Sequence, residues 1–213
     1  MKTVNLAEVI DRIQTDNQDN DLCTNNLISH DDVECIVNVL RKNYQDQLRI
    51  EKSIKNTSIS LTGTVHYVPN LFHHFICYSI SKKFKAELLL IEVAKQLNDD
   101  EFAAYFVAIA DQLRYPNSFS FAAMTFILNY FEIASNSHKE IILVELIKRS
   151  LCVTSPPSSV VNIIKQLHLK YEDMIRTLLQ QNGEYETFLK AKDIFDHHFI
   201  QHSSSGHVFH LRE

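Results

Sequence analysis

Glycine and proline are scarce in this sequence. Its 213 residues include three glycines and four prolines, and tryptophan is absent. Turn-rich all-β folds and disordered linkers depend on glycine and proline, so both classes are disfavoured. The glycines stand far apart, at positions 63, 183 and 206. Their separation excludes a Walker loop and a dinucleotide-binding fingerprint, because both need clustered glycines to let backbone approach a phosphate.

Positive charge, paired cysteines and long apolar runs are also lacking. The formal net charge is -5 and the pI is near 6.1, so general nucleic-acid binding is not expected. Cys23, Cys35, Cys77 and Cys152 form no Cys-x-x-Cys pair, and we interpret them as buried thiols in a reducing compartment. No run of 18 apolar residues and no signal-peptide pattern occurs. We therefore expect a protein that is neither secreted nor membrane-spanning.

Helical periodicity is present from about residue 66 onward. Its clearest instance is a set of apolar residues at offsets of 0, 3, 4, 7 and 11, namely Phe102, Tyr105, Phe106, Ile109 and Leu113. This spacing predicts a helix with one face in the core. Asn98 and Glu101 have the spacing of a capping box at its start, and Pro116 requires the helix to end near Tyr115.

The same start signals recur along the chain. Asn117-Ser118 is expected to cap the following helix, and Ser137 to Glu140 has the pattern of another capping box. An earlier helix opens at Ser29, and a short first helix is predicted from Val4 to Ile13. The segments 15–28 and 52–65 are predicted to be polar loops.

These elements predict an all-α protein. We expect about eight to ten helices packed as stacked antiparallel hairpins, in the manner of a HEAT-like α-solenoid. Residues 1–200 are predicted to form a single helical-repeat domain. Residues 201–213, which include a Ser-Ser-Ser-Gly stretch, are predicted to be a mobile tail.

No set of residues assembles the parts of a catalytic centre, so we predict no catalytic, cofactor-binding or metal-ligating residue and no enzymatic activity. One alternative stays open: an all-α metal-dependent hydrolase that uses His30, Asp31, His73, His74 and the histidines of the C-terminus. His30-Asp31 is the dipeptide of such hydrolases, but their site needs a histidine further upstream, and His30 is the first histidine in the chain.

Residues 108–118 read Ala-Ile-Ala-Asp-Gln-Leu-Arg-Tyr-Pro-Asn-Ser. This run resembles the signature of the C-terminal domain of the Not-one scaffold subunit of the CCR-NOT deadenylase complex, and departs from it at Asp111, where the family has Asn. The resemblance covers about residues 66–190 and is strong over 101–167. The family's His-Thr and Trp-Gly pairs are replaced here by Phe119-Ser120 and Ser158-Ser159.

The resemblance implies a non-catalytic scaffold domain that docks the paired Not-box subunits of the CCR-NOT complex. Such a domain supports mRNA deadenylation and decay, translational repression and the regulation of transcription, in the cytoplasm and also in the nucleus. It implies no cofactor, no membrane, no small-molecule substrate and no strong direct binding of nucleic acid. Arg114, Tyr115 and Asn117 sit in the signature and are the candidate partner-binding residues; the same residues also suit a purely structural corner between two helices.

Overall fold

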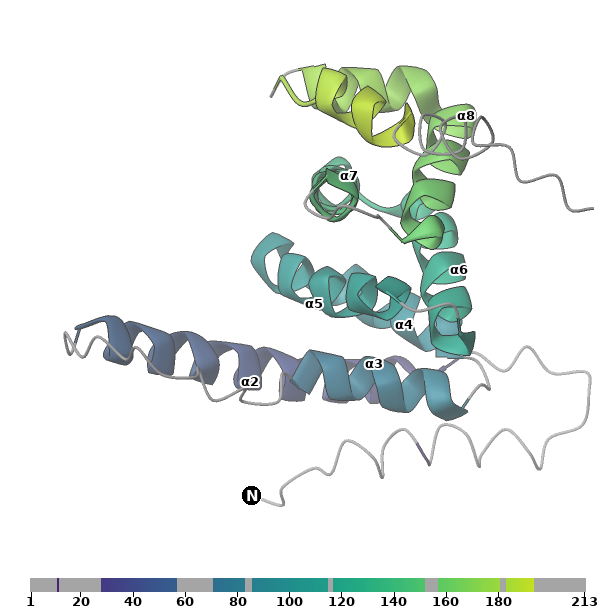
Figure 1. Cartoon of the computed structure of the whole chain (residues 1–213). Helices are drawn as coiled ribbons and strands as arrows, with labels where there is room; N and C mark the ends of the chain where they lie inside the picture. The colour runs from purple at the N-terminus through teal and green to yellow at the C-terminus, as the bar shows by residue number, and fades with distance from the viewer. Residues whose placement is uncertain are drawn as a thin grey trace, which may run out of the picture. The chain divides into compact units, whose positions relative to one another are not determined.

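The computed structural model describes residues 28–56, 71–82, 86–114, 117–151, 157–180 and 183–193, together with Asp11 (Figure 1). Every element in these segments is helical, and none of them contains a strand. The all-α fold class is therefore confirmed. None of the helices in this part of the chain combines the length and the hydropathy needed to cross a lipid bilayer.

The described elements are seven α-helices named in order, one 3₁₀ turn and a final short helix. In chain order they are α2 (His30–Asn56), α3 (Leu71–Lys82), α4 (Ala86–Gln96), α5 (Asp99–Asp111), the 3₁₀ turn η1 (Gln112–Arg114), α6 (Ser118–Ile133), α7 (Asn136–Leu151), α8 (Ser158–Gln180) and a helix over 185–193. The chain divides into two compact units, Met1–His138 and Lys139–Glu213. The boundary falls within α7, and each unit is described by itself. The prediction of one domain over 1–200 stays a prediction.

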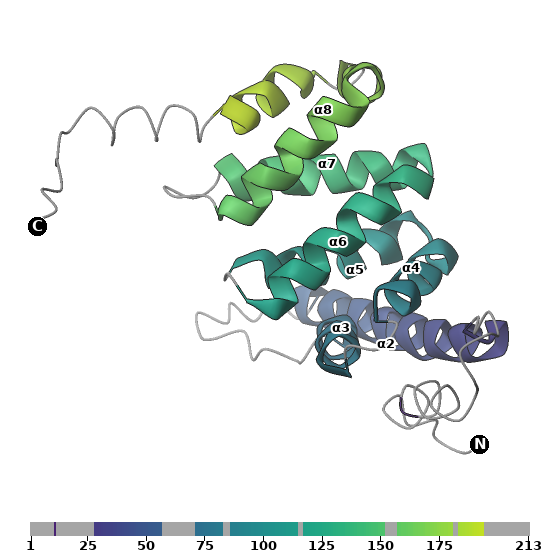
Figure 2. The same cartoon turned by 90° about the vertical axis from the view of Figure 1, so that its right-hand side faces the viewer.

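In the first unit, helices that are near in sequence pack together (Figures 1 and 2). Helix α3 contacts α2, α4, α5 and α6, while α4 also contacts α2 and α6, and η1 contacts α5 and α6. Contacts of a helix with the next helix and with the one after it are what stacked hairpins require. The finer HEAT-like arrangement stays a prediction.

Aromatic side chains from α3, α5 and α6 fill the core of this unit. The five residues of the predicted apolar stripe, four on α5 and Leu113 on η1, are all buried, which confirms the stripe. Tyr105 stands at the centre: its ring meets Phe72, Phe75 and Phe126, and its hydroxyl donates to the Leu90 carbonyl at 3.2 Å. Burial raises the pKa of Tyr105 well above its ordinary value. The phenol therefore stays neutral and serves as a buried hydrogen-bond donor.

Of the three N-terminal caps predicted at Asn98, Asn117 and Ser137, the first two are confirmed and the third is wrong in register. Asn98 caps α5 in a complete capping box, and Asn117 caps α6. At α7 the predicted box began at Ser137, but the helix starts two residues earlier. There the Ser135 hydroxyl accepts from the His138 backbone N–H at 3.1 Å. Several polar residues in a row permit either register, and burial of His138 favours the earlier one.

Other expected boundaries shift as well. Helix α2 begins after Ser29 as predicted but continues to Asn56, so the first part of the predicted 52–65 loop is helical. Residues 51–56 contain no glycine or proline, and nothing in that stretch ends a helix. The predicted helix over Val4–Ile13, apart from helical Asp11, lies outside the described residues, as does the tail 201–213.

In the second unit, two predicted helices are joined into α8, which bends at Tyr171, where φ is -134° and ψ is 30°. The helix ends before Gly183, whose φ of +71° is the left-handed conformation that glycine adopts most easily. The Glu184 backbone N–H then donates to the Leu179 carbonyl at 3.0 Å. Beyond this turn, the ring of Phe188 stacks on His168 with centroids 5.9 Å apart, so helix 185–193 packs against α8.

Candidate docking site at the start of helix α6

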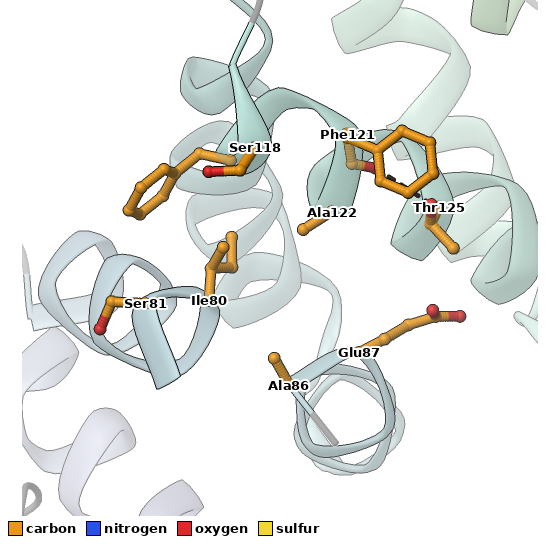
Figure 3. Close-up of a pocket in the computed structure, with 9 residues that line it drawn as sticks. Ile80, Ser81, Ala86, Glu87, Ser118, Phe121, Ala122 and Thr125 are labelled. Atoms are coloured by element: carbon orange, nitrogen blue, oxygen red, sulfur yellow. Dashed lines mark hydrogen bonds between the residues drawn. The ribbon is translucent and has the colours of Figure 1, made fainter. Parts of the chain in front are cut away.

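A groove of about 400 Å³ opens in the first unit where three helices meet. Its lining comes from the end of α3, the start of α4 and the first turns of α6: Ile80, Ser81, Ala86, Glu87, Ser118, Phe119, Phe121, Ala122 and Thr125. The side chains of Ile80, Ala86 and Ala122 point toward one another from the three helices (Figure 3). The groove is therefore built where the start of α6 packs against α3 and α4.

The lining is mainly apolar. Phe121 stands at the rim with 67% of its surface exposed. The hydroxyls of Ser81 and Thr125 donate to carbonyls of their own helices, at 2.7 and 3.0 Å. These two hydroxyls thus have partners and present no activated nucleophile.

Glu87 is the one carboxylate among the lining residues. Its Oε1 accepts a hydrogen bond from Asn129, which ties α4 to α6 beside the groove. An apolar surface with a carboxylate at one end suits an apolar side chain flanked by a basic or hydrogen-bond-donating group.

The segment before α6 sets the position of the groove. Asn117 has extended backbone angles, φ -145° and ψ -177°, and its side-chain oxygen accepts from the Ser120 N–H at 3.0 Å. This cap fixes where α6 begins. Phe119 and Ala122 consequently face the groove, while Ser120 and Ala123 take the buried positions one residue later.

Of the predicted partner-binding residues, Arg114 and Asn117 flank the start of α6 and are not among the residues that line the groove. Arg114 ends η1, is exposed, and has its Nη2 3.4 Å from Asp111 Oδ1. Asn117 is exposed but uses its side-chain oxygen as the helix cap. Tyr115 lies outside the described residues. The structure thus places Arg114 and Asn117 at one corner.

Sequence reasoning missed the groove itself. Phe121 falls between the buried positions Ser120 and Ala123 and is an aromatic residue outside the apolar stripe of its helix. An aromatic residue outside the stripe was the feature of the sequence that could have indicated a surface site. Nothing in the sequence marks Ile80 and Glu87 as part of it, because their approach to α6 depends on how three helices pack.

The described residues of the alternative hydrolase site lie on two helices, α2 and α3. Donor atoms of His30, Asp31 and Glu34 lie within 4.8 Å of one another at the exposed start of α2. His73 and His74 are on α3, where His73 is half-buried and His74 exposed. The C-terminal histidines lie outside the described residues.

A buried histidine, the last residue of the first unit, contacts residues of α5 and α6. His138 stacks on Phe102 with ring centroids 3.9 Å apart and a 9° angle between the planes. Its Nδ1 lies 2.8 Å from the Tyr130 hydroxyl, and its Nε2 lies 3.4 Å from Asp99 Oδ1. Burial lowers the pKa of His138, and the Asp99 carboxylate opposes that shift. With 7% of its side chain exposed, the imidazole is enclosed and acts as a packing element.

No family model matches this sequence, and neither a curated protein nor a solved structure matches it.

Proposed function

We propose that this chain is a non-catalytic scaffold domain that docks partner Not-type subunits of the CCR-NOT complex. In that role it supports mRNA deadenylation and decay, translational repression and the regulation of transcription, in the cytoplasm and the nucleus. It works through surface shape, needs no cofactor and takes no small-molecule substrate.

The observation that carries this proposal is the position of the groove. The described residues of the run 108–118 that resembles the Not-one signature, 108–114 and 117–118, form the end of α5, η1 and the capped start of α6. The first turns of α6 then supply more than half of the residues that line the groove. The signature therefore ends where the apolar surface begins.

The chemistry of the groove supports binding over catalysis. It offers apolar surface, an exposed aromatic ring at the rim and one carboxylate. Exposed aromatic residues at a concave apolar surface are common anchors of protein interfaces. We propose that an extended or helical segment of a partner places an apolar side chain here, next to Arg114, Tyr115 and Asn117.

The test is purification of the full chain from its source cell, followed by identification of the bound proteins. The expected result is recovery of the paired Not-box subunits, which persists after nuclease treatment because the contact is between proteins. A chain that recovers neither subunit contradicts the proposal. Release of adenosine nucleotides from poly(A) by the purified chain, abolished in His30→Ala, would favour the hydrolase instead.

A further inference from the structure

Glu87 supplies the one carboxylate among the residues that line the groove. The Asn129 amide donates to its Oε1, and that hydrogen bond leaves Oε2 for a second donor. The ion pairs formed within the described part of the chain do not include Glu87. The groove therefore presents a carboxylate whose negative charge is not paired with a cation of the described residues.

The carboxylate and the exposed ring of Phe121 border the same side of the groove, with Thr125 between them in Figure 3. Phe121, Thr125 and Asn129 are spaced by four residues along α6 and so share one face of that helix. The Thr125 hydroxyl donates to the Phe121 carbonyl at 3.0 Å. Because Asn129 holds the Glu87 carboxylate at the end of this row, the ring and the charge belong to one continuous surface.

The position of Glu87 in α4 explains part of its role. It lies in the first turn, where a carboxylate is favoured by the positive end of the helix. That effect does not require an apolar groove beside the carboxylate or a Phe121 ring that is 67% exposed. At protein interfaces, an aromatic or apolar anchor is commonly surrounded by a polar, charged rim. The arrangement is thus that of an anchor site with one charged edge.

We infer that this groove selects a protein segment in which a lysine or arginine lies next to an apolar anchor. The apolar side chain packs on Ile80, Ala86 and Ala122, whose side chains point toward one another in Figure 3. The cation donates to Glu87 at the edge, and a segment with an acidic residue in that position is rejected by like charge. The net charge of -5 favours the same approach of a basic segment. This inference rests on the proposed function in taking the occupant to be a protein.

The two parts of the contact differ in their response to salt. An exposed ion pair is screened as the ionic strength rises, because the Debye length falls from about 10 Å at 0.1 M to about 3 Å at 1 M. Burial of apolar surface against Phe121 is not weakened in this way. Loss of the charge of Glu87 should therefore weaken binding at low salt only, while loss of the Phe121 ring should weaken it at every salt concentration.

The first experiment measures the affinity of the full chain for the paired Not-box subunits at about 50 mM and about 500 mM sodium chloride. Glu87→Gln should weaken binding about fivefold at the low concentration and by less than about twofold at the high one. Phe121→Ala should weaken binding at both concentrations. Glu92→Gln is the matched control, because it removes the same charge from α4 at a carboxylate that pairs with Lys95 and does not line the groove. It should bind like the parent.

This experiment separates the inference from the proposed function. If Phe121→Ala weakens binding of the subunits while Glu87→Gln binds like the parent at both salt concentrations, the inference is wrong and the proposed function stands. If the parent binds neither subunit, the proposed function is wrong, and the second experiment decides the inference. Circular dichroism checks that each variant is folded.

The second experiment does not need the Not-box subunits. The full chain selects binders from a library of random dodecapeptides, and peptides that also bind Phe121→Ala are discarded. We expect the retained peptides to combine an apolar residue with a lysine or arginine, and to bind Glu87→Lys about tenfold more weakly than the parent or worse. Failure to retain any peptide, retained peptides without a basic residue, or equal binding to Glu87→Lys and the parent would each overturn the inference.

Discussion

Arg41 on α2 and Glu101 on α5 stand sixty residues apart in sequence and form a two-pronged ion pair. The guanidinium Nε donates to Oε1 at 2.8 Å, and Nη2 donates to Oε2 at 3.2 Å. Nη2 also donates to the Gln96 carbonyl at 3.0 Å. The same carboxylate accepts from the Asn98 N–H at 3.2 Å, so one side chain both caps α5 and attaches it to α2.

Arg41→Ala should therefore destabilise the fold. The Glu101 side chain is 3% exposed, and the variant leaves its carboxylate buried without its cation. We expect a loss of about 2 to 3 kcal/mol, because Arg41 itself is partly exposed. Chemical denaturation measures this loss. Arg49→Ala on the same helix breaks the exposed pair with Asp46 and should cost less than about 0.5 kcal/mol. Equal losses in the two variants would contradict the account.

The caps of α5 and α6 predict a second pair of effects. Asn98→Ala and Asn117→Ala should each cost about 1 kcal/mol, because each removes an acceptor from a first-turn N–H. Ser118→Ala is the matched control, since the side chain of Asn117 supplies the cap, and it should cost much less. Urea denaturation midpoints measure all three changes. If Ser118→Ala lost more stability than Asn117→Ala, the assignment of the α6 cap to Asn117 would be wrong.

His138 predicts a pH dependence of stability. Its folded pKa lies below the ordinary value of 6.5, so between these two values the unfolded state binds more protons. Stability should therefore fall as the pH drops below about 6.5, and this contribution should level off below the folded pKa.

Denaturation midpoints at pH 7.5 and 5.5 measure this contribution. The parent chain should lose more stability between the two values than His138→Gln does, because the variant has no imidazole to protonate. His74→Gln changes an exposed histidine and should behave like the parent. If His138→Gln lost as much stability as the parent, the buried imidazole would not be the cause.

Whether a contact of the fold could be predicted from the sequence depended on how many residues separate its two partners. The capping box of Asn98 and Glu101 could be predicted because its partners are three residues apart, and the buried stripe of α5 followed from the helical period. The ion pair of Arg41 with the same carboxylate could not be predicted, since no sequence pattern indicates a contact between residues sixty positions apart.

The candidate site shows the same limit. Arg114 and Asn117 were predicted as corner residues because the signature and the capping pattern are local, and the structure places both at the start of α6. The groove depends on α3 and α4 reaching α6, so Ile80 and Glu87 gave no signal in sequence.

The corner residues give a prediction for binding. Arg114→Ala combined with Tyr115→Ala should weaken co-purification of the paired Not-box subunits by about 2 kcal/mol or more if both side chains are anchors. Arg114 is exposed and its partner Asp111 is three residues away, so the fold should survive. Circular dichroism checks this. A folded double variant that binds as well as the parent would make the signature a structural corner only.

The most direct measurement is the affinity of the purified chain for the paired Not-box subunits, compared between Phe121→Ala and Ile133→Ala. Both side chains are large, apolar and exposed on α6, at 67% and 55%, but only Phe121 lines the groove. Phe121→Ala should weaken binding at least tenfold, since it removes the aromatic rim of the docking surface. Ile133→Ala should bind like the parent. Equal affinities for the parent and both variants, or no binding by the parent, would contradict the account.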